Sequence, residues 1–315
     1  MGRERVHEAT FRATPAQDAE HAYSAHPHVG HDGDRATVGV ARGEWVGGDR
    51  MTRLGGVIAW ALAAVLVLLL AMPLLALVLR AIDNLSRRTE TTTEFVRQAL
   101  VLSLATTAVS LCIVIVLGTP LAYLLARRQF RGRRLVETLV DLPMVLPPAV
   151  AGIALLAAFG RRGLFGDELG ALGISLPFTS AAVVLAQTFV AVPFFVRSAR
   201  AGFSRIDREL ESAAADLGAT PFHVLWTIIL PLSKQSLVAG AVLAWARALG
   251  EFGATIMFAG NLPGKTQTMP LAIYGRLEAG DLEAALLLSS MLLGVSIVIL
   301  LGVRIVGGVG RGPLS

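Results

Sequence analysis

The feature that most constrains this chain is a series of apolar segments, each long enough to cross a lipid bilayer. Residues 54–79 and residues 98–126 contain no charged side chain, and about 20 apolar residues suffice for one transmembrane helix. Because backbone polar groups inside lipid must find partners within the chain, such segments are expected to be helical. Only 16% of the residues are charged and 54% are hydrophobic. The sequence therefore predicts an all-α integral membrane protein.

Four further apolar segments bring the predicted number of transmembrane helices to about six. They comprise residues 135–160, 176–196, 235–259 and 284–303. The first of these contains three prolines, which leave backbone carbonyls without their helical partners. Such carbonyls are tolerated at membrane depth only against protein or a water-filled path.

The placement of arginines predicts how these helices are oriented. Residues 127–134 contain five arginines, and four more follow the fourth segment at Arg197, Arg200, Arg205 and Arg208. Because Lys and Arg accumulate in cytoplasmic loops, six spans place both termini in the cytoplasm of a bacterial-type plasma membrane. The same rule explains the net charge of +5, so we expect no nucleic-acid partner.

Four regions are predicted along the chain. Residues 1–50 are polar without apolar periodicity and are expected to form a disordered cytoplasmic tail. Residues 51–94 contain the first transmembrane helix and an external loop, residues 95–304 the main transmembrane domain, and residues 305–315 a second cytoplasmic tail. Met51 stands directly before the first span and is an alternative start. Five of the six histidines fall in the first tail, but no cysteine or fixed turn supports a metal site there.

A shorter stretch at residues 209–231 interrupts the hydrophobic segments. Apolar positions before Gly218 recur at helical spacing, and this glycine is placed to end a helix in the left-handed conformation. Thr220 and Pro221 stand where an N-cap and a first helical residue belong, and Pro231 is expected to end the second helix. Two short amphipathic helices joined at a glycine expose an apolar side that a partner must cover. A helix lying on the bilayer surface is the alternative.

This stretch resembles the cytoplasmic coupling loop of ABC importer permeases, which here corresponds to residues 205–231. The matching residues are Ala213, Ala214, Gly218, Ile228, Leu230 and Pro231. The family pattern has a glutamate where this chain has Ser212, and Glu211 lies one position earlier. The resemblance implies a permease similar to type I importers, which acts as a homodimer. It also implies that the matching residues, together with Glu211, contact a separate ABC ATPase subunit.

A second group of segments narrows the resemblance. Residues 247–255, with the sequence RALGEFGAT, resemble the oxyanion branch of these permeases, which handles molybdate, tungstate and sulfate. Residues 260–274, 141–148 and 160–163 are most similar to the molybdate members. The resemblance extends over about residues 95–304. It implies import of molybdate, with sulfate or tungstate as alternatives, and an extracytoplasmic oxyanion-binding protein. No cofactor is expected in this chain, because the partner ATPase uses the ATP.

Two ionisable residues, Arg247 and Glu251, lie four positions apart near the middle of the predicted fifth span. Such groups are costly in a membrane and face protein or an aqueous pathway. One interpretation is a structural ion pair, and the other is a role in the route of an anion. The candidate pathway residues are Arg247, Gly250, Glu251, Gly253 and Thr255. The two glycines also allow helices to approach closely, as at a dimer interface.

Other function classes are weaker interpretations of the same residues. Residues 259–266 are similar to a phosphate-binding loop, but they follow a membrane helix rather than a strand and are predicted to lie outside. A secondary anion transporter could use Arg247 and Glu251 as a proton-coupled pair, but the docking loop occurs once rather than in two matched halves. No cluster with metal-ligand spacing occurs in the spans, so the chain is not expected to be an enzyme.

Overall fold

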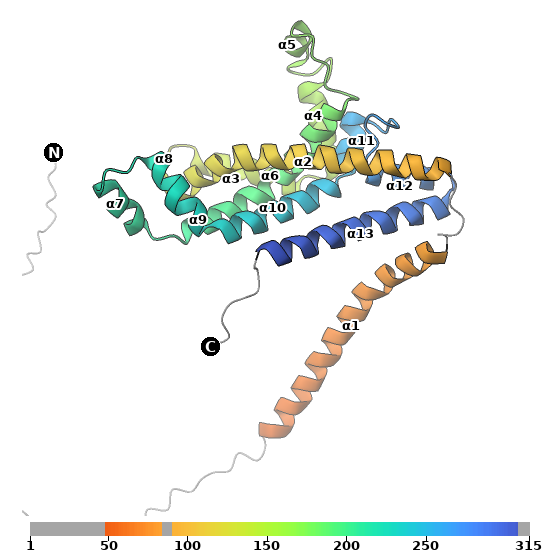
Figure 1. Cartoon of the computed structure of the whole chain (residues 1–315), viewed down its shortest axis with the longest axis horizontal. Coiled ribbons are helices and arrows are strands. Elements are labelled where there is room, and N and C mark those ends of the chain that lie inside the picture. Colours follow the sequence, from red (N-terminus) through yellow and green to blue (C-terminus); the bar gives the residue numbers. More distant parts are fainter. Residues whose placement is uncertain (1–47, 84–89, 308–315) are drawn as a thin grey trace, which may run out of the picture. The chain divides into compact units, whose positions relative to one another are not determined.

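The computed structural model describes residues 48–83 and 90–307, and every regular element in these ranges is a helix. The predicted all-α fold is therefore confirmed for this part of the chain. The chain divides into two units, residues 1–60 and 61–315, and the packing described below lies within the second unit. Figure 1 shows the helices in chain order. Most of the predicted N-terminal tail and most of the C-terminal tail lie outside the described residues.

Four of the predicted spans are continuous helices long and apolar enough to cross a membrane. They are α1 (Gly48–Asp83), α2 (Glu90–Arg127), α6 (Ser180–Ser204) and α13 (Leu282–Gly307). A fifth span results if the bent pair Pro221–Leu232 and Lys234–Leu249 crosses as one unit. The first two helices begin earlier than the predicted region boundaries, at Gly48 and Glu90.

The predicted third and fifth spans are each broken into two helices. The pieces are α3 (Arg133–Val145), α4 (Pro148–Phe159), α10 (Lys234–Leu249) and α11 (Gly253–Ala259). Between α3 and α4, Leu146 has extended backbone with ψ 132°. Pro147 causes this, because a proline ring disfavours the helical conformation of the residue before it. The C-terminal end of α3 and the N-terminal end of α4 therefore meet within the predicted third span.

Shorter helices complete the described chain. They are α5 (Gly166–Ala171), α7 (Arg208–Asp216), α8 (Pro221–Val224), a π-helical turn (Leu225–Ile229), α9 (Leu230–Leu232) and α12 (Met269–Glu278). The prediction that Pro231 ends its helix is wrong, because Pro231 lies inside α9. In the π turn the Leu230 N–H donates to the Leu225 carbonyl, five residues back. This shifted hydrogen-bond register accommodates a following residue that has no N–H to donate. The run ends at Ser233, where the chain bends by 76° into α10.

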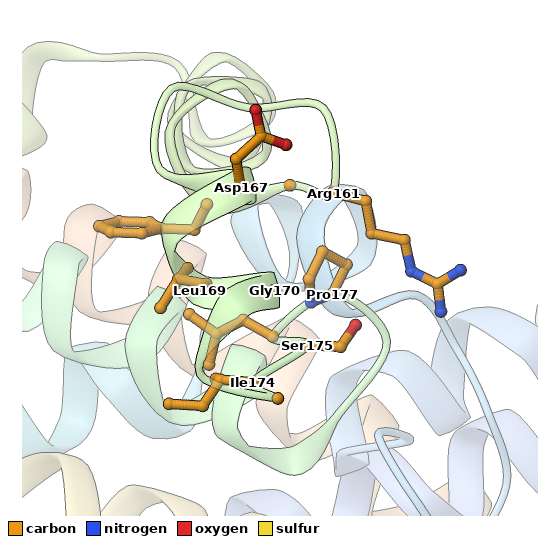
Figure 2. A pocket seen from close by; sticks show the side chains of 12 residues that line it. Arg161, Asp167, Leu169, Gly170, Ile174, Ser175 and Pro177 are labelled. Carbon is orange, nitrogen blue, oxygen red and sulfur yellow. The ribbon is translucent and has the colours of Figure 1, made fainter.

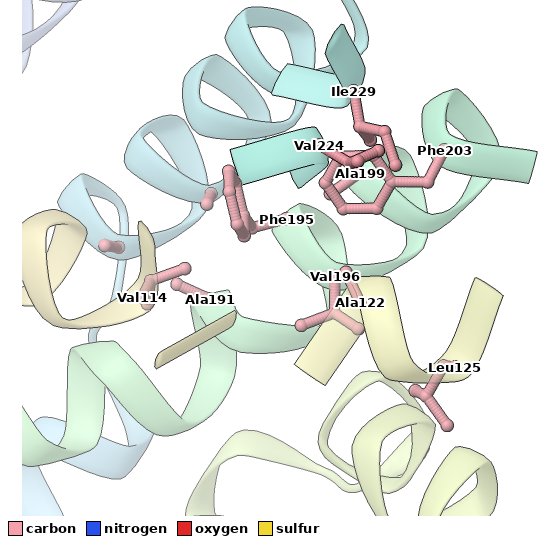
Figure 3. Packing of buried hydrophobic residues seen from close by; sticks show 12 residues of the cluster. Val114, Ala122, Leu125, Ala191, Phe195, Val196, Ala199, Phe203, Val224 and Ile229 are labelled. Atoms are coloured by element: carbon pink, nitrogen blue, oxygen red, sulfur yellow. The ribbon is translucent and has the colours of Figure 1, made fainter. Parts of the chain in front are cut away.

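The core of the second unit forms around α6, which packs against α2, α10, α11 and α3. Its largest cluster of buried apolar residues joins α2, α6 and α10 to the segment 221–232 (Figure 3). Phe203 of α6 lies in this cluster with Val224 and Ile229, and all three side chains are buried. The helices after Gly218 are therefore fixed to the transmembrane core rather than attached loosely to it.

A second cluster joins α4, α6 and α11. Close approach of α4 to α11 depends on Gly152, because a Cβ at this position would lie 2.7 Å from the Ala254 carbonyl oxygen and 2.7 Å from the Met257 Cβ. The two broken spans thus pack against each other at Gly152, where a side chain would not fit.

We predict that Gly152→Ala destabilises the protein by about 1–3 kcal/mol, because the added methyl group forces α4 and α11 apart. The matched control is Gly294→Ala in α13, where an added Cβ has nothing within 4 Å. Thermal unfolding in detergent measures the effect as a lower midpoint for the first variant alone. Equal midpoints for the two variants would contradict the close α4–α11 packing.

Candidate functional site

The predicted turn between α7 and α8 is confirmed in its details. Gly218 has φ +84°, in the left-handed region that favours glycine. The Thr220 side chain caps α8 by accepting a hydrogen bond from the His223 backbone N–H at 3.3 Å, and Pro221 is the first helical residue. Local sequence therefore determines the sharp turn that makes residues 207–232 a compact projection.

The outer side of this projection is apolar and exposed. We define the docking surface as Leu210, Leu217, Phe222 and Trp226, whose side chains are all exposed, with Leu217 at 89%. The Phe222 and Trp226 rings lie beside each other, with centroids 6.0 Å apart. Several large apolar side chains left exposed on one short segment are typical of interaction sites. Leu210 lies on α7, Leu217 directly after it, Phe222 on α8 and Trp226 in the π-helical turn. The projection therefore has an exposed apolar side, as its helical spacing predicts.

The motif residues do not all lie on this docking surface. Ala213 and Pro231 are exposed, whereas Ala214, Ile228 and Leu230 pack against the buried cluster that contains Phe203 and Ile229. The structure thus separates the motif into an outer part available to a partner and an inner part that holds the projection on the transmembrane helices. Sequence spacing alone does not distinguish these two parts.

Glu211 lies on the inner side, where it contacts the end of α2. Its Oε1 is 2.8 Å from the Arg127 Nε, and its Oε2 accepts a hydrogen bond from the Tyr123 hydroxyl at 3.3 Å. Arg127, whose side chain is 6% exposed, also donates to the Ile206 carbonyl at 2.9 Å. We call this group the tether. The arginine-rich sequence at residues 127–134 predicted the orientation of the helices but not this specific contact.

The predicted pair Arg247 and Glu251 lies at the break between α10 and α11. The Arg247 Nη1 is 2.6 Å from the Glu251 Oε2, and Glu251 is 1% exposed. The Glu251 Oε1 accepts a hydrogen bond from the Ala254 backbone N–H at 2.7 Å. One buried carboxylate thus binds the end of α10 and caps the first turn of α11, a role that favours a structural function for Glu251. Arg247 is partly exposed and keeps further N–H donors for a second group.

The remaining pathway candidates lie near this pair but differ in their surroundings. Gly253 lies against α4, since a Cβ there would lie 2.5 Å from the Pro148 Cβ. Gly250 is exposed. The Thr255 hydroxyl is buried and makes no hydrogen bond within the described part of the chain. At the break between α10 and α11, the partly exposed Arg247 therefore lies near a close contact between α11 and α4.

A cavity of about 560 Å³ lies between the end of α4, α5 and the segment that follows α5 (Figure 2). Its charged lining residues are Arg161 and Asp167, which have opposite signs. This cavity therefore has no net charge to select an anion. Among residues 48–83 and 90–307, no group of three His, Cys, Asp or Glu side chains is placed to hold a metal ion.

Residues 118–307 match the model of the protein family described as "Binding-protein-dependent transport system inner membrane component". The matched range contains the docking surface, the tether and the break between α10 and α11. It excludes α1 and most of α2.

Named relatives are similar over most of the chain. The molybdenum transport system permease protein ModB of Mycobacterium tuberculosis is 46% identical over 237 residues, which cover 75% of this chain and 89% of that protein. ModB of Escherichia coli is 43% identical over 178 residues, covering 56% and 78% respectively. The sulfate transport system permease protein CysT of Synechocystis is 36% identical over 196 residues, covering 62% and 68%.

Solved structures share the arrangement of helices. A chain of a bacterial ABC transporter involved in the import of the acidic polysaccharide alginate matches with a TM-score of 0.66 and 16% identity, covering 84% of this chain and 99% of that one. A chain of the MetNI methionine ABC transporter in an inward-facing conformation matches with a TM-score of 0.54 and 19% identity, covering 70% and 96%. At these identities the likeness concerns the fold.

We predict that Glu251→Ala lowers the yield of folded protein, because it leaves Arg247 unpaired and the Ala254 N–H uncapped, at a cost of about 3–5 kcal/mol. Glu251→Gln keeps an oxygen that accepts from Ala254 and is expected to retain most of the folded protein. Exchanging Arg247 and Glu251 should not restore folding, because an arginine at position 251 cannot accept this hydrogen bond.

The measurement is the monodisperse fraction in size-exclusion chromatography, with the thermal midpoint of each variant. Equal losses for the alanine and glutamine variants, or recovery in the exchanged variant, would show that only the charge pair matters.

Proposed function

The chain belongs to the family of binding-protein-dependent transport system inner membrane components, and from this premise we propose that it is the permease of an ATP-driven molybdate importer. The observation that carries the proposal is the 46% identity to a ModB protein over 89% of that protein's length. The predicted resemblance to oxyanion permeases is confirmed by these relatives. The chain is a transport subunit rather than the ATPase.

In this proposal the docking surface enters a cleft of the ATPase subunit. Its exposed leucines and aromatic rings bury apolar area only when a partner covers them, and burial of such area drives association. Of the predicted coupling residues, Ala213 and Pro231 lie on the exposed outer part of the projection. Glu211, Ala214, Gly218, Ile228 and Leu230 hold its shape and position.

Movement of the ATPase reaches the membrane through the inner side of the projection. Val224 and Ile229 share a buried cluster with Phe203 of α6, and closely packed interiors transmit displacement rather than absorb it. Because α6 packs against α2, α10 and α11, a shift of the projection moves the helices around the break. We propose that this motion alternates the pathway between inward-facing and outward-facing states.

The anion route is proposed to pass the break between α10 and α11 in a dimer of two copies. Molybdate is an anion, and a partly exposed arginine with free N–H donors suits the oxygens of such a group. Arg247 meets this description, while the neighbouring Glu251 reduces the local positive charge and so prevents tight retention. Gly250, Gly253 and Thr255 would line the same region. Selectivity is then supplied mainly by the external binding protein.

The partners follow from this arrangement. An ABC ATPase binds at residues 205–231, a second copy of the chain completes the pathway, and an oxyanion-binding protein docks on the opposite face. The projection, and with it both termini, lies in the cytoplasm of a bacterial plasma membrane. ATP is used by the ATPase and no cofactor is held by this chain. The four predicted regions, residues 1–50, 51–94, 95–304 and 305–315, are proposed as its organisation.

Two alternatives differ in their support. Sulfate and tungstate are alternative substrates, and the 36% identity to a CysT protein favours sulfate as the second candidate. A secondary anion transporter needs neither a binding protein nor an ATPase, so membership of a binding-protein-dependent family argues against it.

Uptake into proteoliposomes tests the proposal. The chain is reconstituted with the ATPase and the binding protein, and radiolabelled molybdate is added outside with ATP inside. We expect uptake only with all three proteins and ATP. Competition by unlabelled sulfate or tungstate then shows whether the importer also accepts either anion. Uptake without ATP would favour the secondary transporter, and transport of sulfate but not molybdate would reassign the substrate.

We predict that Leu217→Asp and Gly218→Val both weaken ATPase binding. The first places a charge on the docking surface, and the second places a branched side chain at a positive φ, which costs about 1–2 kcal/mol or more. The control is Leu172→Asp, since Leu172 is also exposed, at 73%, but lies outside the projection. Pull-down of the ATPase measures the effect, and normal recovery with both variants would exclude residues 205–231 as the coupling element.

A further inference from the structure

We propose that the turn between α2 and α3 forms a pocket for the headgroup of an anionic phospholipid. The pocket has a volume of about 390 Å³ and lies between this turn, the first turns of α3 and Arg200 of α6. Three of its lining residues are arginines: Arg133, Arg134 and Arg200. It is separate from the docking surface and from the break between α10 and α11.

The charges in the pocket leave a net surplus of cations. The Arg133 Nε lies 2.8 Å and the Arg200 Nη2 lies 3.0 Å from the same oxygen of Glu137. Glu137 is the only carboxylate among the lining residues, so one negative charge faces three positive charges. Two guanidinium groups at the pocket thus share one carboxylate oxygen, which does not neutralise both.

The arginines keep hydrogen-bond donors for a phosphate. A guanidinium has five N–H donors, and the contact with Glu137 engages a single nitrogen each of Arg133 and Arg200. Arg134 makes no ion pair within the described part of the chain and is exposed. Planar guanidinium groups bind phosphate oxygens in pairs of parallel hydrogen bonds. The pocket therefore suits a phosphate with one negative charge better than a neutral headgroup.

The surface beside the pocket distinguishes a lipid from free phosphate. Leu135, Leu139 and Leu142 recur at helical spacing on α3 and are exposed, at 64%, 57% and 44%. They begin one residue after Arg134, so this arginine borders both the basic pocket and an apolar strip. A phospholipid has a phosphate that can bind in the basic pocket and hydrocarbon chains that can cover the apolar strip. Basic pockets between transmembrane helices bind such headgroups.

The assignment to the cytoplasmic leaflet rests on the proposed function, because the tether places the end of α2 beside the proposed ATPase-docking projection. Binding itself does not depend on this orientation. In mixed detergent–lipid micelles both faces meet the same lipids, so the binding test stands even if the transport proposal fails.

The test measures retention of phosphatidylglycerol and of phosphatidylcholine on the full-length chain by native mass spectrometry. We expect selective retention of phosphatidylglycerol. Each basic residue near an anionic lipid contributes about fivefold in affinity, so Arg134→Gln with Arg200→Gln should weaken retention about 25-fold. Arg134→Gln alone, at an exposed position that makes no ion pair within the described residues, should weaken it about fivefold.

The control is the double variant Arg161→Gln with Arg162→Gln, which removes the same charge from the exposed connector after α4 and should change retention less than twofold. If both double variants lose phosphatidylglycerol retention equally, the effect depends only on the total charge of the protein, and the proposed pocket is wrong. Displacement of the lipid by an equal concentration of inorganic phosphate would overturn the lipid assignment. Loss of ATPase pull-down in the Arg134→Gln variant would assign the pocket to the ATPase contact instead.

Discussion

The close packing of α6 against α2 and α10 is the interaction on which the rest of the second unit depends. Apolar side chains gain little from leaving lipid for one another, so membrane helices associate through small residues and interhelical hydrogen bonds. Gly240 of α10 allows the approach, since a Cβ there would lie 2.8 Å from the Ser198 Cβ. The Ser198 hydroxyl then donates to the Ser236 carbonyl at 2.7 Å.

The contact of α6 with α2 also depends on interhelical hydrogen bonds. Gln187 of α6 is buried and donates to the Thr107 hydroxyl at 3.3 Å, while the Ser110 hydroxyl donates to the Val184 carbonyl at 2.9 Å. A buried polar group without a partner is costly, so these contacts favour a single rotational setting of the two helices. That setting is what places Arg127, at the end of α2, beside the projection.

Residues whose roles are local could be predicted from the sequence, and residues with distant partners could not. Gly218 and Thr220 act through their own backbone and the next turn, so the pattern was sufficient. The continuation of the helix past Pro231 cannot be predicted from local sequence, because the preceding π turn forms against the buried cluster. Glu211 and Glu251 were recognised as charged positions. Their contacts with α2 and with the first turn of α11 depend on how the helices pack.

The tether has a consequence for how the two ends of the molecule influence each other. Arg127 binds both the Ile206 carbonyl and Glu211, so these contacts link a tilt of α2 to the position of α7. Linkage between two binding events is reciprocal: if occupancy at one site alters the affinity of another, the second alters the first by the same factor. In the proposed transporter, a cargo that changes the tilt of α2 would therefore also change the affinity of the docking surface for the ATPase. Through these polar contacts, the proposed ATPase would distinguish an empty permease from a loaded one.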